Sequence, residues 1–125
     1  MSRLLLALAL LLGCRKAAVD PPAPVVDSQA VLRAEARLVI ESRCGSCHTS
    51  SYPTAAPPAL AVFDLVNPDW SGKMTEAQLR SALDRLKTGG GDAEAPLPTA
   101  AQTQTFERYV EAELKRRSAS PITSN

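Results

Sequence analysis

The sequence predicts a small all-α domain built from three long helices and one short helix. Apolar residues recur at helical spacing in three separate stretches, and two of these stretches open with a capping box, a Thr followed three residues later by a Gln. No stretch alternates apolar and polar residues between Asn-Gly or Asp-Gly turns, so a β-sheet has little support. The 125 residues suffice for one such domain and are too few for two.

The first long helix is predicted to begin at Ser28, a favourable N-cap residue, and to run to about Arg43. Apolar side chains recur along it at i, i+3 and i+7, which gives the helix one face for the core. The residues expected on that face are Val31, Ala34, Leu38 and Val39. A shorter apolar run over residues 59–66 lies between a Pro-rich loop and the turn-forming residues 67–70, and we expect it to form the short helix.

The other two long helices are marked by their ends. Thr75 and Thr99 each open a helix as the first residue of a capping box. Gly89 ends the first of these helices, and the basic residues 115–117 end the second at the negative end of its dipole. The expected core residues are Leu79, Ala82, Leu83 and Leu86 in one helix and Phe106, Tyr109, Val110 and Leu114 in the other.

Residues 1–13 form a predicted export signal. Arg3 precedes an apolar run over residues 4–12, which is less than half of the about 20 apolar residues needed to span a bilayer as a helix. Leu11-Leu12-Gly13-Cys14 resembles the lipobox of bacterial lipoproteins, and this resemblance implies cleavage before Cys14 and lipidation of its sulfur and amine. Two acyl chains already give stable anchoring, so Cys14 is expected to hold the mature protein at a membrane. An ordinary secretory signal with an incidental Cys is the alternative.

Residues 14–27 are expected to be a lipid anchor and Pro-rich spacer, because three of residues 21–24 are prolines and favour extended backbone. The folded domain is expected over residues 28–117 and a flexible polar tail over residues 118–125. Cleavage removes Arg3 from the 14 basic residues, so 13 basic side chains remain against 13 acidic ones. Because the chain has no concentrated basic face, we expect no nucleic-acid partner.

Cys44-Gly45-Ser46-Cys47-His48 is the motif that carries chemistry. Two thiols three positions apart can each add across a vinyl group on one edge of a porphyrin, and the adjacent imidazole then lies under the iron. His48 is the single His of the chain, and assigning Cys14 to lipid leaves none of the three Cys unused. We therefore expect one covalent haem c, attached through Cys44 and Cys47, with His48 as the proximal axial ligand of the iron.

With this motif at the end of a helix in an exported chain, residues 28–117 resemble the class I cytochrome c domain. The resemblance implies a helix leading into the motif, a loop around the haem, and a C-terminal helix that crosses the first. It also implies transfer of single electrons between redox partner proteins. No residue is placed as a general base or nucleophile, so we expect an electron carrier and not an enzyme.

The expected location is the cell envelope, with the domain lipid-anchored and facing the periplasm. Arg15 follows Cys14 in place of the Asp that in some bacteria signals retention in the inner membrane, which favours the outer membrane.

Other functions of the motif stay open. A structural zinc site would need a carboxylate as fourth ligand, a thioredoxin-like dithiol would need a βαβ context, and a plain disulfide would need neither. A haem with an open sixth iron position would make the protein a small-ligand sensor or binder. Without haem, the protein would be a structural lipoprotein.

The sixth iron position is where the sequence departs from the class I pattern. That family usually supplies a Met from the loop before the C-terminal helix, but residues 89–98 contain no Met. Met74 is the one thioether of the mature chain and is a possible sixth ligand. Its place before Thr75 also fits the hydrophobic staple of the next helix, and we favour the staple. The iron would then be five-coordinate, or bound by water or by a Lys such as Lys73.

Overall fold

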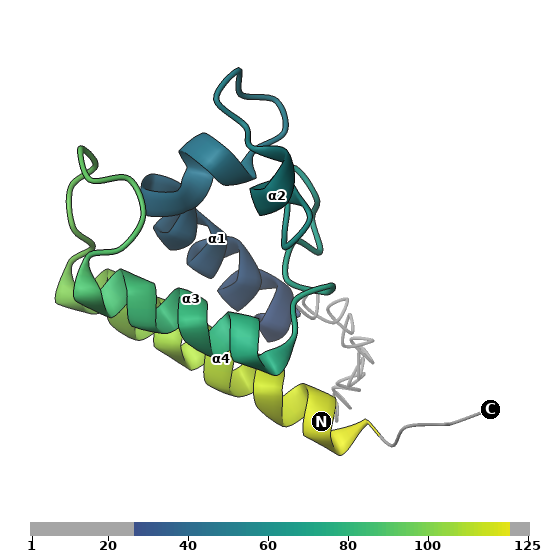
Figure 1. Cartoon of the computed structure of the whole chain (residues 1–125). Coiled ribbons are helices and arrows are strands. Elements are labelled where there is room, and N and C mark those ends of the chain that lie inside the picture. Colours follow the sequence, from purple (N-terminus) through teal and green to yellow (C-terminus); the bar gives the residue numbers. More distant parts are fainter. Residues whose placement is uncertain (1–26, 121–125) are drawn as a thin grey trace, which may run out of the picture.

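The structure is a computed structural model that describes residues 27–120 (Figure 1). It contains four helices, α1 (Ser28–His48), α2 (Pro57–Leu60), α3 (Glu76–Thr88) and α4 (Ala100–Ala119), and no strand in the described range. The predicted all-α class, with three long helices and one short one, is confirmed at this level.

Helix α4 packs against both α1 and α3, and α2 contacts α1. In Figure 1, α3 and α4 run side by side, and α2 lies apart from them, in contact with α1. The rings of Trp70, Phe106 and Tyr109 meet in the interior, with ring centroids of Trp70 and Tyr109 5.3 Å apart. The buried apolar residues are Ala36, Val39, Ile40, Phe63, Leu65, Trp70, Met74, Leu79, Leu86, Phe106, Tyr109 and Val110.

Helix α1 differs from its prediction in three respects. Its N-cap is Asp27, whose carboxylate accepts a hydrogen bond from the backbone N–H of Gln29 at 3.0 Å. It continues past Arg43 to His48, so the motif forms its last turns. The predicted core face was wrong except for Val39, because packing against α4 buries a different face of the helix. The buried residues of α1 are Ala36, Val39, Ile40, Arg43 and Gly45, while Val31, Ala34 and Leu38 are exposed.

The predicted starts of α3 and α4 and the predicted end of α3 are confirmed. Both capping boxes form: the Thr75 hydroxyl accepts from the N–H of Gln78, and that of Thr99 from the N–H of Gln102, each at 3.2 Å. Gly89 ends α3 with a φ of +80°, a left-handed conformation that favours glycine. All the residues predicted for the core from these two helices are buried or packed against it.

The short helix is displaced from its prediction: it overlaps the predicted residues 59–66 only at Ala59 and Leu60 and begins in the Pro-rich loop. Helix α2 begins at the two prolines Pro57 and Pro58, which are tolerated in a first turn, and ends at Leu60. Beyond it the chain turns, and the Asp64 carboxylate accepts from the N–H groups of Ser50 and Val66 at 3.1 and 3.0 Å. This side-chain bonding favours a turn over a further helical turn.

The C-terminal helix runs further than predicted, since Ser118 and Ala119 are helical and do not belong to a tail. The predicted signal peptide, Cys14 and residues 15–26 of the spacer lie outside the described residues, as do residues 121–125. None of the helices in residues 27–120 has the length and apolar character needed to cross a bilayer.

Candidate functional site

The last turns of α1 present the two thiols and the imidazole of the motif together. Cys44, Cys47 and His48 stand at i, i+3 and i+4, which places their side chains on one face of the helix. Cys47 is exposed, and Cys44 and His48 are half-buried. The three residues predicted as a haem attachment site are therefore neighbours in space.

The loop after α1 folds back to bind the end of the helix. Helix C-termini leave four backbone carbonyl groups without helical partners. Here the carbonyl oxygen of His48 accepts from Leu65 N at 2.8 Å, and that of Cys47 accepts from Ala56 N at 3.1 Å. These bonds fix the loop and the motif against each other.

One residue of this loop orients the imidazole of His48. The Nδ1 atom of His48 lies 3.2 Å from the carbonyl oxygen of Phe63. Because a carbonyl oxygen only accepts, Nδ1 carries the proton in this bond, and Nε2 keeps its lone pair. Metal-binding His residues commonly show this arrangement, in which the second ring nitrogen donates to a carbonyl.

The surroundings of His48 favour its neutral form. Burial lowers the pKa of His48 below its ordinary 6.5, with a hydrogen bond to the backbone of Phe63 acting in the opposite direction. The neutral imidazole is the form that ligates a metal.

Two adjoining cavities open beside the motif. One, of about 380 Å³, lies between the α2 region and α3, and the other, of about 600 Å³, lies against the thiols. His48, Ala59 and Arg85 line both cavities. The first is also lined by Pro58, Val62, Phe63, Met74, Gln78, Ser81 and Ala82, and the second by Arg43, Cys44, Ser46, Cys47, Thr54, Gly91 and Asp92. The walls are mainly apolar, as is typical of cofactor sites.

The thiol of Cys44 is protonated at neutral pH. Burial raises the pKa of Cys44 above its ordinary 9.0, and the positive charges of Arg85 and Arg43 lower it by less. The group therefore presents an S–H bond to the cavity and no anion.

Arg43 ties the loop between α3 and α4 to this site. It is 2 % exposed, and its guanidinium donates to the carbonyl oxygen of Gly89 at 2.6 Å. The carbonyl oxygen of Arg43 accepts from Asp92 N at 2.7 Å. Gly91, with a φ of +99°, allows this close approach, because a Cβ atom there would collide with the Arg43 carbonyl.

Met74 lines the same cavity as His48 and is 2 % exposed. It also directly precedes the N-cap Thr75 and shares a buried cluster with Leu79, as expected of a staple residue. Met74 therefore stands in the staple position that the sequence favoured and also lines the cavity beside His48. Lys73 is exposed and does not line either cavity.

Two arginines near the site were not predicted. The missed signal for Arg43 is its spacing: it lies three residues after Ile40 and four after Val39, on the face of α1 that is buried. Arg117 stands four residues after Glu113, a spacing that favours an ion pair, and its contacts with Ser71 and Met74 depend on the fold.

The alternatives for the motif gain little from the geometry. In residues 27–120, no three His, Cys, Asp or Glu side chains are arranged to hold a metal ion, so a zinc site lacks a ligand set. A thioredoxin-like dithiol requires a strand before the motif, and the described chain has none there. Cys44 and Cys47 are free thiols in this structure.

Comparisons of this chain with protein-family models, with curated proteins and with solved structures find no match. Any function proposed for the chain therefore rests on the residues of the site.

Proposed function

We propose that this protein is a lipid-anchored c-type cytochrome that carries single electrons between redox partners in the cell envelope. The observation that carries the proposal is the placement of His48. Its Nδ1 atom is bound to the Phe63 carbonyl, and its ring borders both the thiols and an apolar cavity. A lone structural His would need neither the thiols nor the cavity.

The residues of the site fit a covalently attached haem. The thiols of Cys44 and Cys47 would each add across a vinyl group, with sulfur bonded to one carbon and hydrogen to the other, so the attachment consumes no oxidant. His48 would ligate the iron through Nε2. When bound, the haem supplies an iron that changes between ferric and ferrous states and so accepts or releases one electron.

The remaining walls would hold the ring and exclude water. Ala59, Val62 and Phe63 give one side of the cavity apolar atoms, and Ala82 of α3 adds another. Arg85, which lines both cavities, supplies a cation with which the carboxylates of a haem would pair. Lipidation of Cys14 would keep this domain at the membrane and facing the periplasm, within reach of redox partner proteins.

Expression with a haem-attachment system, followed by denaturing electrophoresis and haem staining, tests the proposal. The wild-type band is expected to stain, and a C44A/C47A double variant is expected to lose the stain. A matched control is Cys14→Ser, which removes the third thiol and should keep the stain. A wild-type band without stain, in a protein confirmed to be exported, would contradict the proposal.

His48→Ala is expected to keep at least part of the covalent stain and to change the absorption spectrum of the iron. This result would separate attachment through the thiols from ligation through the imidazole.

A further inference from the structure

We propose that a second pocket, away from the motif, binds a small oxyanion, a phosphate or a carboxylate, through Arg33, Arg37 and Trp70. This site goes beyond the proposed function, since electron transfer by a haem does not require it. Its lining residues belong to neither of the two cavities beside His48. The site can therefore be tested separately from haem attachment.

The pocket lies on the first half of α1 and has a volume of about 290 Å³. Its lining residues are Ala30, Arg33, Ala34, Arg37, Pro68 and Trp70. The four from α1 stand at i, i+3, i+4 and i+7, so they share one face of the helix. Two long cationic side chains and two short ones therefore form one wall, and the turn at residues 68–70 forms the other.

Trp70 brings a buried hydrogen-bond donor to this pocket. The residue is 2 % exposed, and its indole Nε1 atom has no hydrogen-bond partner among residues 27–120. Buried indole N–H groups usually have a partner, because an unsatisfied donor in the interior is costly. The ring is held in place by its packing against Phe106 and Tyr109. An acceptor bound in the pocket would satisfy this donor.

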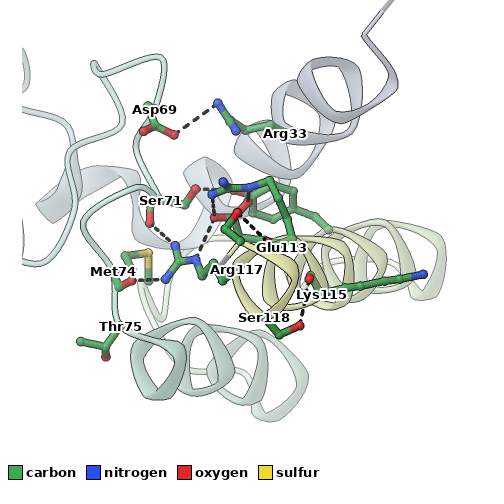
Figure 2. Close-up of polar contacts among 12 residues, drawn as sticks. Arg33, Asp69, Ser71, Met74, Thr75, Glu113, Lys115, Arg117 and Ser118 are labelled. Carbon is green, nitrogen blue, oxygen red and sulfur yellow. Dashed lines mark hydrogen bonds and ion pairs between the residues drawn. The ribbon is translucent and has the colours of Figure 1, made fainter. Parts of the chain in front are cut away.

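The two arginines add donors of the same kind. The Nε atoms of Arg33 and Arg37 are both buried and have no partner within the described chain. Nη1 of Arg33 pairs with the Asp69 carboxylate at 3.2 Å, and Figure 2 shows this guanidinium reaching from α1 toward Asp69. Arg37 forms no ion pair with any of residues 27–120. The pocket therefore has N–H groups from three side chains without acceptors.

The charge at the pocket favours an anion. Arg33 and Arg37 stand at i and i+4, a spacing at which like charges destabilise a helix. Asp69 is the one carboxylate paired with either arginine in residues 27–120, and its side chain is 62 % exposed. Two guanidinium groups against one exposed carboxylate leave net positive charge. Because the planar guanidinium matches the oxygens of carboxylate and phosphate groups, an oxyanion fits both the charge and the donors.

The carboxylates of a haem are the competing occupant of these donors. The ring of Phe63 stacks on His48 and contacts Trp70 edge-on, so one aromatic residue separates the imidazole from the pocket. If haem carboxylates reached the pocket, they would hold its donors in the haem-loaded protein. An anion added to that protein would then find no site.

Phosphate titrated into the reduced, haem-loaded protein, labelled with ¹⁵N, tests the proposal by nuclear magnetic resonance. Trp70 is the single Trp of the chain, so the one indole N–H signal reports on this pocket. We expect the signal to shift to saturation with phosphate or acetate, and chloride at equal ionic strength to leave it in place. A signal that does not move, or that moves equally with chloride, would overturn the site.

Arg37→Gln removes the guanidinium that has no ion pair within the described chain, and it should weaken phosphate binding by about tenfold or more. Arg80→Gln is the matched control, because Arg80 is an exposed arginine of α3 that does not line the pocket. It removes the same charge and should keep the wild-type affinity. Equal weakening in the two variants would show attraction by overall charge and would overturn the pocket.

Trp70→Phe keeps an aromatic ring in the core and removes the indole N–H. Calorimetry measures its phosphate affinity, which we expect to be weaker than that of the wild type. Wild-type affinity in this variant would overturn the role of Trp70. Should Trp70→Phe fail to fold, Arg37→Gln on the surface of α1 still decides. A protein that carried no haem would be tested by the same titration, so failure of this site and failure of the proposed function are distinguishable.

Discussion

The ring of His48 lies parallel to the ring of Phe63, with centroids 3.7 Å apart and planes inclined by 5°. The backbone carbonyl of Phe63 also accepts from Nδ1 of His48. Phe63 therefore orients the imidazole of His48 twice. Its ring stacks on the imidazole plane, and its backbone carbonyl binds Nδ1. The ring of Phe63 further contacts Trp70 edge-on, which links His48 to the aromatic core.

Phe63→Ala is expected to lower the free energy of unfolding by about 3 to 5 kcal/mol, because the side chain is buried and its removal leaves a cavity. Chemical denaturation followed by circular dichroism measures this loss. Val66→Ala, in the same loop but with a half-exposed side chain, is the control and should change stability by less than about 1 kcal/mol. Equal effects in the two variants would contradict the role of Phe63.

Gly91→Ala is expected to cost about 1 to 3 kcal/mol, because an L residue is strained at its φ of +99° and the new Cβ would meet the Arg43 carbonyl. Hydrogen exchange should also become faster at Asp92, whose N–H bonds to that carbonyl. Gly45→Ala provides the contrast, since this residue is helical and its new Cβ would meet the flexible Glu41 side chain at 3.1 Å and no backbone atom, so we expect a smaller cost than at Gly91. Undiminished protection at Asp92 would refute the expected loop displacement.

The sequence predicted α3 and α4 well because their signals are local. A Thr hydroxyl, a Gln side chain and a Gly at positive φ act within a few residues, so spacing alone reveals them. The His48 motif was likewise visible, since three residues within one helical turn carry it. The sequence did not reveal the cavity beside His48, which α3 and the α2 region form together.

The face of α1 was mispredicted because two apolar stripes compete along this helix. Val31 and Leu38 form one, and Ala36 and Ile40 belong to the other, which packs against the core. Only contact with α4, distant in the sequence, decides between them. Helical spacing puts Arg43 on the same face as Val39 and Ile40, but the groups that satisfy its buried guanidinium are carbonyl groups of a loop nearly fifty residues away, which the sequence did not indicate.

Cys14→Ser is expected to move the protein from the membrane fraction to the soluble fraction, because the proposed lipid anchor would be attached at the sulfur that this change removes. Fractionation followed by immunoblotting measures the shift, and mass spectrometry of the mature wild-type N-terminus should show a lipid-modified Cys14. Recovery of wild-type protein with an unmodified Cys14 would contradict the prediction.

Glu113 should make the free energy of unfolding depend on pH in the acid range. Hydrogen bonding to Arg116 lowers the pKa of Glu113 from its ordinary 4.5 to about 2, with Arg117 acting in the same direction and burial opposing both. The pKa is lower in the folded state, so the stabilisation is complete above the unfolded value. It is lost as pH falls from about 4.5 through about 2. Its size is on the order of 3 kcal/mol.

Glu113→Gln should therefore lose this stabilisation at neutral pH and show a flatter stability profile than the wild type between pH 4.5 and 2. Urea unfolding at a series of pH values measures both effects. Glu107→Gln is the control, because Glu107 pairs with Lys87 at the surface, with side chains 37 % and 43 % exposed. An exposed pair contributes at most about 1 kcal/mol. If the free energy of unfolding fell equally with pH in the wild type and in Glu113→Gln, the ionised Glu113 carboxylate would not stabilise the fold, and the prediction would be wrong.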